Sequence, residues 1–147
     1  ALEIISYYEH RWLVEEYHKV WKSDGTDIES LRLQSQENME RLVTIHGFIA
    51  TRILQLKFAR NLPNNPSCEQ VLSGKARKLL WLKRVKATLP DTAPNMKWAY
   101  EELARLGGWK DTKRTGHASV KVLMQGWLKL QAILEGYDLA KSLESDL

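Results

Sequence analysis

The chain has 147 residues, of which 44% are hydrophobic, and a formal net charge of +4. Cys68 is the single cysteine, so an internal disulfide is excluded, and we expect a small buried thiol in a protein of the reducing cytoplasm. No apolar run approaches the roughly 20 residues that a membrane-spanning helix needs, so no membrane partner is expected. The positive charge permits a polyanionic partner without requiring one.

The first predicted helix covers residues 8–22, which contain no Gly or Pro and carry apolar residues at three- and four-residue steps. One side of this helix should face the core, and its members are Leu2, Leu13, Val14, Tyr17, Val20 and Trp21. The opposite side is rich in charge, and its members are Tyr8, Arg11, Glu15, Lys19 and Lys22.

Glu15 is flanked along this charged side by a guanidinium and by two ammonium groups. Such a surface suits a divalent metal and the phosphates around it. It equally fits a solvated face, where a Glu–Lys pair one turn apart adds about 0.2–0.5 kcal/mol, and spacing alone favours this second interpretation. His10 and His18 lack the H-E-x-x-H spacing of zinc proteases, so we expect surface or packed imidazoles.

A second long helix is predicted over 39–58, after a polar stretch at 28–36 that should form a loop or a short helical turn. Its apolar residues cover most of the helix circumference, which predicts burial on more than one side. Gly47 in its middle costs about 1 kcal/mol relative to Ala, which suggests that another helix crosses closely there.

The clearest linker lies at 61–66, which contains two Pro and three Asn, and a domain boundary is expected there. Ser67 should open a short helix with Gln70 as its capping-box partner, and Gly74 should break that helix. The next helix, 75–86, is strongly basic, and we expect a solvated face in which Trp81 anchors a neighbouring helix. Its cations are Lys75, Arg77, Lys78, Lys83, Arg84 and Lys86.

Two further helices are predicted, over 95–106 and 118–143, with Gly107 and Gly108 ending the first of them. The basic loop 109–116 between them should be solvated, although Lys110, Lys113 and Arg114 could approach phosphate. In the last helix, Gly126 and Gly136 should allow close backbone approach. Its apolar residues repeat at coiled-coil spacing in a seam of Leu123, Trp127, Leu130, Leu134 and Tyr137. No strand pattern persists, so the fold class is all-α.

The order Tyr8, Arg11, Glu15, Lys22 resembles the Y-R-E-K signature of the insertion-sequence-four family of DNA transposases. The surrounding HRW-x-x-EE-x-HK-x-WK is similar to transposon-five-like members of that family. A second match, near the end of the chain, comprises LGGW, DTKRTG, GW and LAK. The segment from Pro63 to Pro94 departs from the family.

The resemblance implies that residues 1–60 end a ribonuclease-H-like catalytic core and that 61–147 form a helical dimerisation domain. In this family the Glu of the signature is the third carboxylate of a D-D-E triad that binds two Mg²⁺ or Mn²⁺ ions for DNA cleavage and strand transfer. By motif, Glu15 would be the catalytic metal ligand. The residues implied to contact transposon-end DNA are Tyr8, Arg11, Lys19, Lys22, Arg32 and Asn38.

The two Asp of the triad lie on strands before this helix in the family, and the chain begins at Ala1, already within a helical pattern. We therefore expect a fragment of a longer enzyme that has no nuclease activity and no firmly bound metal by itself. The seam of the last helix is the candidate homodimer contact for pairing two transposon ends. Packing within the domain explains the seam equally well.

A second functional hypothesis belongs to a different class of protein. The chain could be a non-catalytic helical module that binds nucleic acid or a protein through residues 75–86. The two hypotheses differ in where DNA contacts map, since the first places them on Arg11, Lys19 and Lys22.

Overall fold

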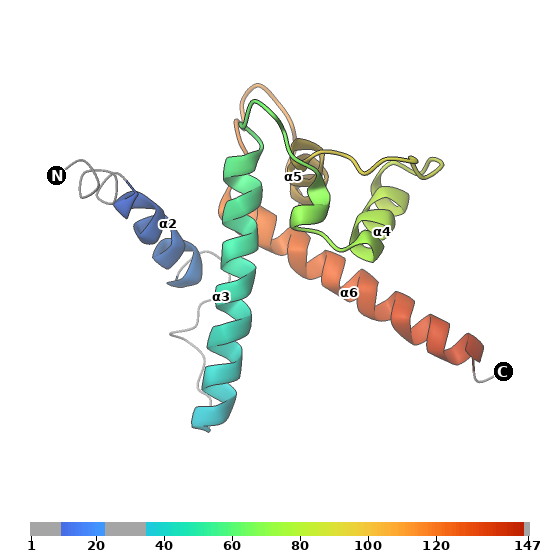
Figure 1. Cartoon of the computed structure of the whole chain (residues 1–147), viewed down its shortest axis with the longest axis horizontal. Coiled ribbons are helices and arrows are strands. Elements are labelled where there is room, and N and C mark those ends of the chain that lie inside the picture. The colour runs from blue at the N-terminus through green and yellow to red at the C-terminus, as the bar shows by residue number, and fades with distance from the viewer. Residues whose placement is uncertain (1–9, 23–34, 146–147) are drawn as a thin grey trace. The chain divides into compact units, whose positions relative to one another are not determined.

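The computed structural model describes residues 10–22 and 35–145. The chain divides into two compact units, Ala1–Leu54 and Gln55–Leu147, called unit 1 and unit 2 below. The described ranges contain no β-strand, which confirms the all-α prediction. The helices are α2 (Arg11–Lys22), α3 (Gln36–Ala59), the short 3₁₀ helix η2 (Cys68–Gln70), α4 (Gly74–Arg84), α5 (Met96–Leu106) and α6 (Val120–Ser145) (Figure 1).

The two units meet within α3, a few residues before the predicted linker. The division into functional domains at residues 60 and 61 stays a prediction. In unit 1, α2 buries Val20, which is 1% exposed, and half-buries Leu13 and Tyr17. Val14 was expected in the core but is 56% exposed, because it lies about 100° around the helix from Leu13, at the margin of the buried stripe.

Gly47 lies directly beneath a side chain of α2. A Cβ added at this glycine would come 2.8 Å from the Tyr17 hydroxyl oxygen. Thr51, one turn later in α3, donates its hydroxyl to the Gly47 carbonyl at 2.9 Å. The prediction of a neighbouring helix at Gly47 is met only by the end of the Tyr17 side chain, and no backbone atom of another described helix lies within 4 Å of the added Cβ.

The helix α3 begins three residues before its predicted start because Ser35 caps it, with its Oγ accepting from the Asn38 amide at 3.2 Å. Burial on several sides is confirmed only for its second half, where Ala50, Ile53 and Leu56 are each 0% exposed. For the first half the prediction is wrong, since Ile45 and Phe48 are each 56% exposed.

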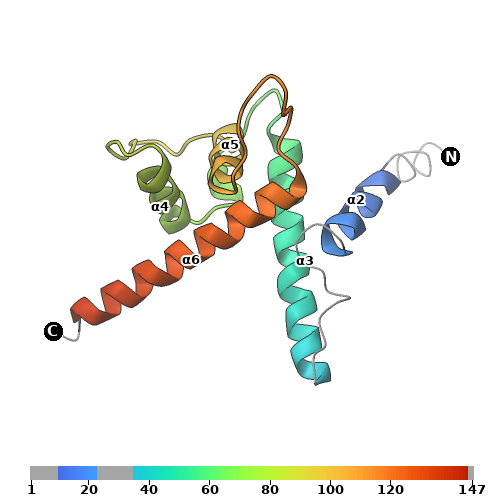
Figure 2. The ribbon, with the colours of Figure 1, turned by 180° about the vertical axis from the view of Figure 1, so that it is seen from behind.

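In unit 2, α5 and α6 cross with their backbones in contact (Figures 1 and 2). A Cβ at Gly107 would lie 2.0 Å from the Val122 carbonyl oxygen, and one at Gly126 would lie 2.0 Å from that of Leu103. The predicted close approach is thus confirmed at Gly126. It is wrong at Gly136, where an added Cβ would meet no described atom within 4 Å.

Short polar side chains begin the helices of unit 2. Ser73 caps α4 and accepts from the Ala76 amide at 3.2 Å, so Gly74 starts a helix instead of breaking one. Asn95 caps α5 and accepts from the Trp98 amide at 2.9 Å. The predicted capping box at Ser67 is wrong, because its Oγ accepts from the Glu69 amide at 3.3 Å at the start of a 3₁₀ turn.

Trp81 anchors α4 to α5, as predicted. Its ring packs against Trp98 with ring centroids 5.4 Å apart. Its indole Nε1 donates to the Thr88 carbonyl at 3.0 Å, which ties the chain after α4 back to the helix. Both the apolar ring of Trp81 and its polar N–H group therefore make contacts within unit 2.

Candidate functional site

The charged side of α2 is exposed along its described length. Arg11, Glu15, Lys19 and Lys22 all lie at the surface. The Arg11 Nε is 3.1 Å from a Glu15 carboxylate oxygen, and the two side chains are 63% and 64% exposed. An ion pair this exposed contributes only about 0.3–0.5 kcal/mol, so a ligand could replace it at low cost.

The remaining predicted DNA contacts are only partly within the described residues. Asn38 lies exposed in the first turn of α3, where its amide bonds to Ser35. Tyr8 and Arg32 lie outside the described residues. The structure therefore brings Arg11, Lys19 and Lys22 onto one face of α2 and places Asn38 on a different helix.

A metal at Glu15 would require more ligands than the described residues supply. Across residues 10–22 and 35–145, no group of three or more His, Cys, Asp or Glu side chains is placed to hold a metal ion. Hard divalent cations take six or more oxygen ligands, several of them from carboxylates. The described residues by themselves therefore do not form a metal site.

Three of the six cations in residues 75–86 form ion pairs within unit 2. Arg77, expected with the solvated cations, is only 9% exposed, and its Nε lies 3.4 Å from a Glu69 carboxylate oxygen in a pairing too poorly aligned to be a hydrogen bond. Lys75 pairs with Asp138 at 2.7 Å, and Arg84 pairs with Glu102 at 3.2 Å. The cations of this segment that have no ion pair among the described residues are Lys78 and Lys83 on α4 and Lys86 just after it.

The seam of α6 is divided between core and surface. Leu123 and Leu130 are 0% exposed and Trp127 is 7% exposed, so these three residues belong to the core of unit 2. Leu134 is half-buried, and Tyr137 is 44% exposed. Leu139 and Leu143 are 72% and 67% exposed and lie on the side of α6 opposite the seam.

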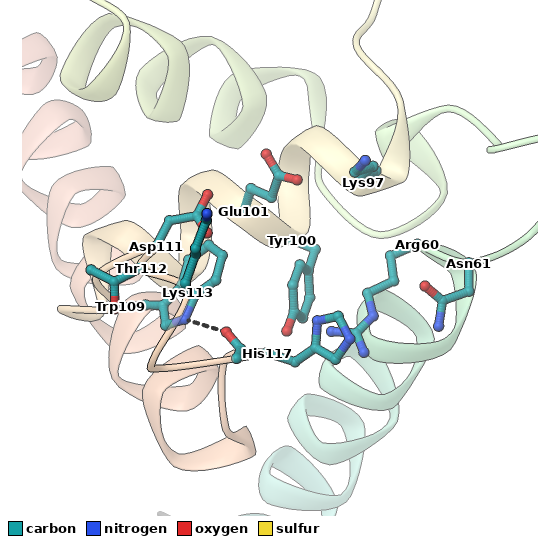
Figure 3. A pocket seen from close by; sticks show the side chains of 11 residues that line it. Arg60, Asn61, Lys97, Tyr100, Glu101, Trp109, Asp111, Thr112, Lys113 and His117 are labelled. Atoms are coloured by element: carbon teal, nitrogen blue, oxygen red, sulfur yellow. Dashed lines mark hydrogen bonds between the residues drawn. The ribbon is translucent and has the colours of Figure 1, made fainter.

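A pocket of about 600 Å³ opens between the end of α3, α5 and the loop that follows α5 (Figure 3). Arg60, Lys97, Tyr100, Trp109 and Lys113 are among its lining residues. Lys113 was predicted to lie in a solvated loop, and no role was predicted for Arg60 or Lys97. The sequence could not predict that these three cations lie together, because they are far apart along the chain. Only the packing of α3, α5 and the loop brings them to one pocket.

The described helices include none long and apolar enough to cross a membrane. A comparison with known protein families finds no family model that matches the chain.

Proposed function

We propose that the chain is the C-terminal part of a cut-and-paste DNA transposase of the insertion-sequence-four family. The supporting observation is that Arg11, Glu15, Lys19 and Lys22 share one exposed face of α2. Those residues include three of the four members of the Y-R-E-K signature. A signature that served only to pack the helix would be expected to face the core.

In this proposal α2 is the last helix of a ribonuclease-H-like core. Glu15 supplies one carboxylate to the Mg²⁺ or Mn²⁺ ions of the parent enzyme, and the other ligands come from elsewhere in that enzyme. Arg11, Lys19 and Lys22 hold phosphates of the transposon end, because cations that neutralise phosphates release counterions and supply most of the affinity for DNA. Metal binding and phosphate binding both require exposed side chains, and the side chains of these four residues are exposed.

Unit 2 would then serve to pair two copies of the enzyme. The exposed side of the end of α6, where Leu139 and Leu143 lie about 40° apart around the helix, is the surface we assign to this contact. Apolar side chains this exposed on one helix are typical of protein contact sites. Leu123, Trp127 and Leu130 instead stabilise the unit from within its core.

DNA binding by the purified chain separates this proposal from a module that binds nucleic acid through α4. Two double variants remove the same charge from different helices: Lys19→Gln/Lys22→Gln on α2 and Lys78→Gln/Lys83→Gln on α4. Fluorescence anisotropy with a short labelled duplex measures both. We expect the α2 variant to bind about tenfold more weakly and the α4 variant to stay within about twofold of the parent chain.

The reverse order of effects would overturn the proposal and favour the α4 module. Equal losses would show binding to general positive charge, which also contradicts the proposal. The salt dependence adds a second measure, since the slope of log K against log salt should decrease by about one for each phosphate contact that is removed.

A further inference from the structure

The pocket of unit 2 has more positive than negative charge available to a ligand. Its lining includes the cations Arg60, Lys97 and Lys113 and the carboxylates Glu101 and Asp111. Figure 3 shows these side chains around the opening, with Lys113 and Asp111 on the side of the loop and Arg60 and Lys97 opposite them.

Both carboxylates are already paired with a cation that does not line the pocket. Arg105 Nη2 lies 3.5 Å from a Glu101 oxygen and 3.2 Å from an Asp111 oxygen. Within the described part of the chain, no ion pair joins Arg60, Lys97 or Lys113 to an acidic side chain. The three lining cations therefore face the hollow without a counter-charge.

Arg60 carries the least solvated of these charges. Its Nε and Nη1 are buried and have no hydrogen-bond partner among the described residues. Its guanidinium carbon lies 4.5 Å from the centre of the Tyr100 ring. Because a buried charge is poorly screened, it attracts an anion in the adjoining space more strongly than an exposed lysine would.

Tyr100 does not neutralise this charge. Its hydroxyl donates to the Ala118 carbonyl at 3.2 Å. Burial raises the pKa of this phenol, against the opposing effect of the Arg60 charge, so the side chain stays neutral at physiological pH.

The aromatic walls of the pocket are occupied by protein groups. Arg60 covers one face of Tyr100, and Arg105 lies over the Trp109 ring at 5.7 Å. The Trp109 indole Nε1 donates to the Gly116 carbonyl at 3.2 Å. The pocket thus offers positive charge and N–H donors, with little aromatic surface on which a base could stack.

We propose that this pocket binds a phosphate group, with Arg60, Lys97 and Lys113 supplying the charge that holds it. The phosphate could belong to a free phosphate compound or to a nucleic-acid backbone. The inference does not depend on the proposed transposase function, because it concerns unit 2 alone and inorganic phosphate suffices to test it.

Inorganic phosphate titrated into the whole chain tests the proposal, with the indole N–H signal of Trp109 in NMR spectra as the reporter from the pocket wall. Trp109→Phe identifies that signal. We expect a saturable shift of the signal and an affinity that falls about tenfold or more in Arg60→Gln. The matched control is Arg114→Gln, which removes the same guanidinium charge at a residue outside the lining, next to Lys113 in the loop after α5, and should change the affinity by less than about twofold.

Lys113→Gln is the second test variant, because its exposed side chain can be changed without disturbing the fold, and it should weaken binding severalfold. Absence of any shift with phosphate would overturn the proposal. So would equal weakening by Arg60→Gln and Arg114→Gln, which would show attraction to general charge. A short DNA duplex then identifies the source: displacement of phosphate by the duplex indicates a backbone phosphate, and unchanged phosphate binding indicates a free one.

Discussion

The two sides of α6 both carry leucines but have opposite environments. In the first half, Leu123 and Leu130 are completely buried where the helix crosses α5. In the second half, Leu139 and Leu143 are mostly exposed, because they lie about 180° and 140° around the helix from Leu130, on the side away from α4 and α5. Residue spacing therefore separates the two sides of α6, and the neighbouring helices determine which of them is buried.

The largest effect we expect comes from truncating a leucine in each half. Leu130→Ala removes a fully buried side chain and should lower the free energy of unfolding by about 2–5 kcal/mol, through lost burial and the cavity left behind. Leu139→Ala, the matched change in the exposed half, should change it by less than about 0.5 kcal/mol. Urea unfolding followed by circular dichroism measures both.

The same pair of variants tests self-association. Sedimentation velocity over a concentration series should show weaker association for Leu139→Ala if the exposed half forms the dimer contact. A large loss of stability in Leu139→Ala would mean that the second half of α6 is also part of a core, which would contradict the division described here.

The glycines of α6 give the next contrast. Gly126→Ala places a methyl group against the Leu103 carbonyl, so the helices must separate, at a cost of about 3 kcal/mol. Gly136→Ala meets open space in the exposed half and should stabilise the chain by about 0.5–1 kcal/mol through higher helix propensity. The thermal unfolding temperature should fall for Gly126→Ala and rise for Gly136→Ala. A change in the same direction for both variants would contradict the close crossing of α5 and α6 at Gly126.

The smallest effect concerns ionisation in the buried part of unit 2. Burial raises the pKa of the Cys68 thiol from 9.0 to about 11, and its side chain is 0% exposed. Because the folded state resists losing this proton, the resulting stability is complete below pH 9.0 and is lost as the pH rises toward about 11. We expect a loss on the order of 1–2 kcal/mol across that range.

Cys68→Ala is the control, since it removes the thiol and keeps a small apolar side chain. Its free energy of unfolding should decline less steeply over the same pH range, measured by urea unfolding at each pH. Parallel curves for the two proteins would show that other groups cause the decline.

The helices could be predicted because their information is local. Apolar spacing located α5 and α6, and the Gly pair correctly ended α5 at Gly107. Two errors in where helices begin occurred where one residue type can serve two roles. Ser35 lengthens α3 as a cap, and Gly74 starts α4 because Ser73 precedes it, so a residue typical of breaks became a first helical residue.

The candidate sites also differ in whether they depend on local spacing or on contacts between distant residues. The charged face of α2 could be predicted because Arg11, Glu15, Lys19 and Lys22 lie on consecutive turns of one helix. The neutralisation of Arg77 and Arg84 could not, because Glu69 and Glu102 are brought to them by packing. Counting cations along a helix therefore overestimates the charge that is available to DNA.

The sequence by itself determined the all-α class, the main helices and the exposed charged face, since each follows from helix geometry over a few turns. Only the tertiary structure decided where the seam of α6 leaves the core, which glycine the helices need at their crossing, and that Arg60, Lys97 and Lys113 share a pocket. These features depend on atoms far apart in the chain, whose proximity is fixed by packing between helices and not by the spacing of residues along any one of them.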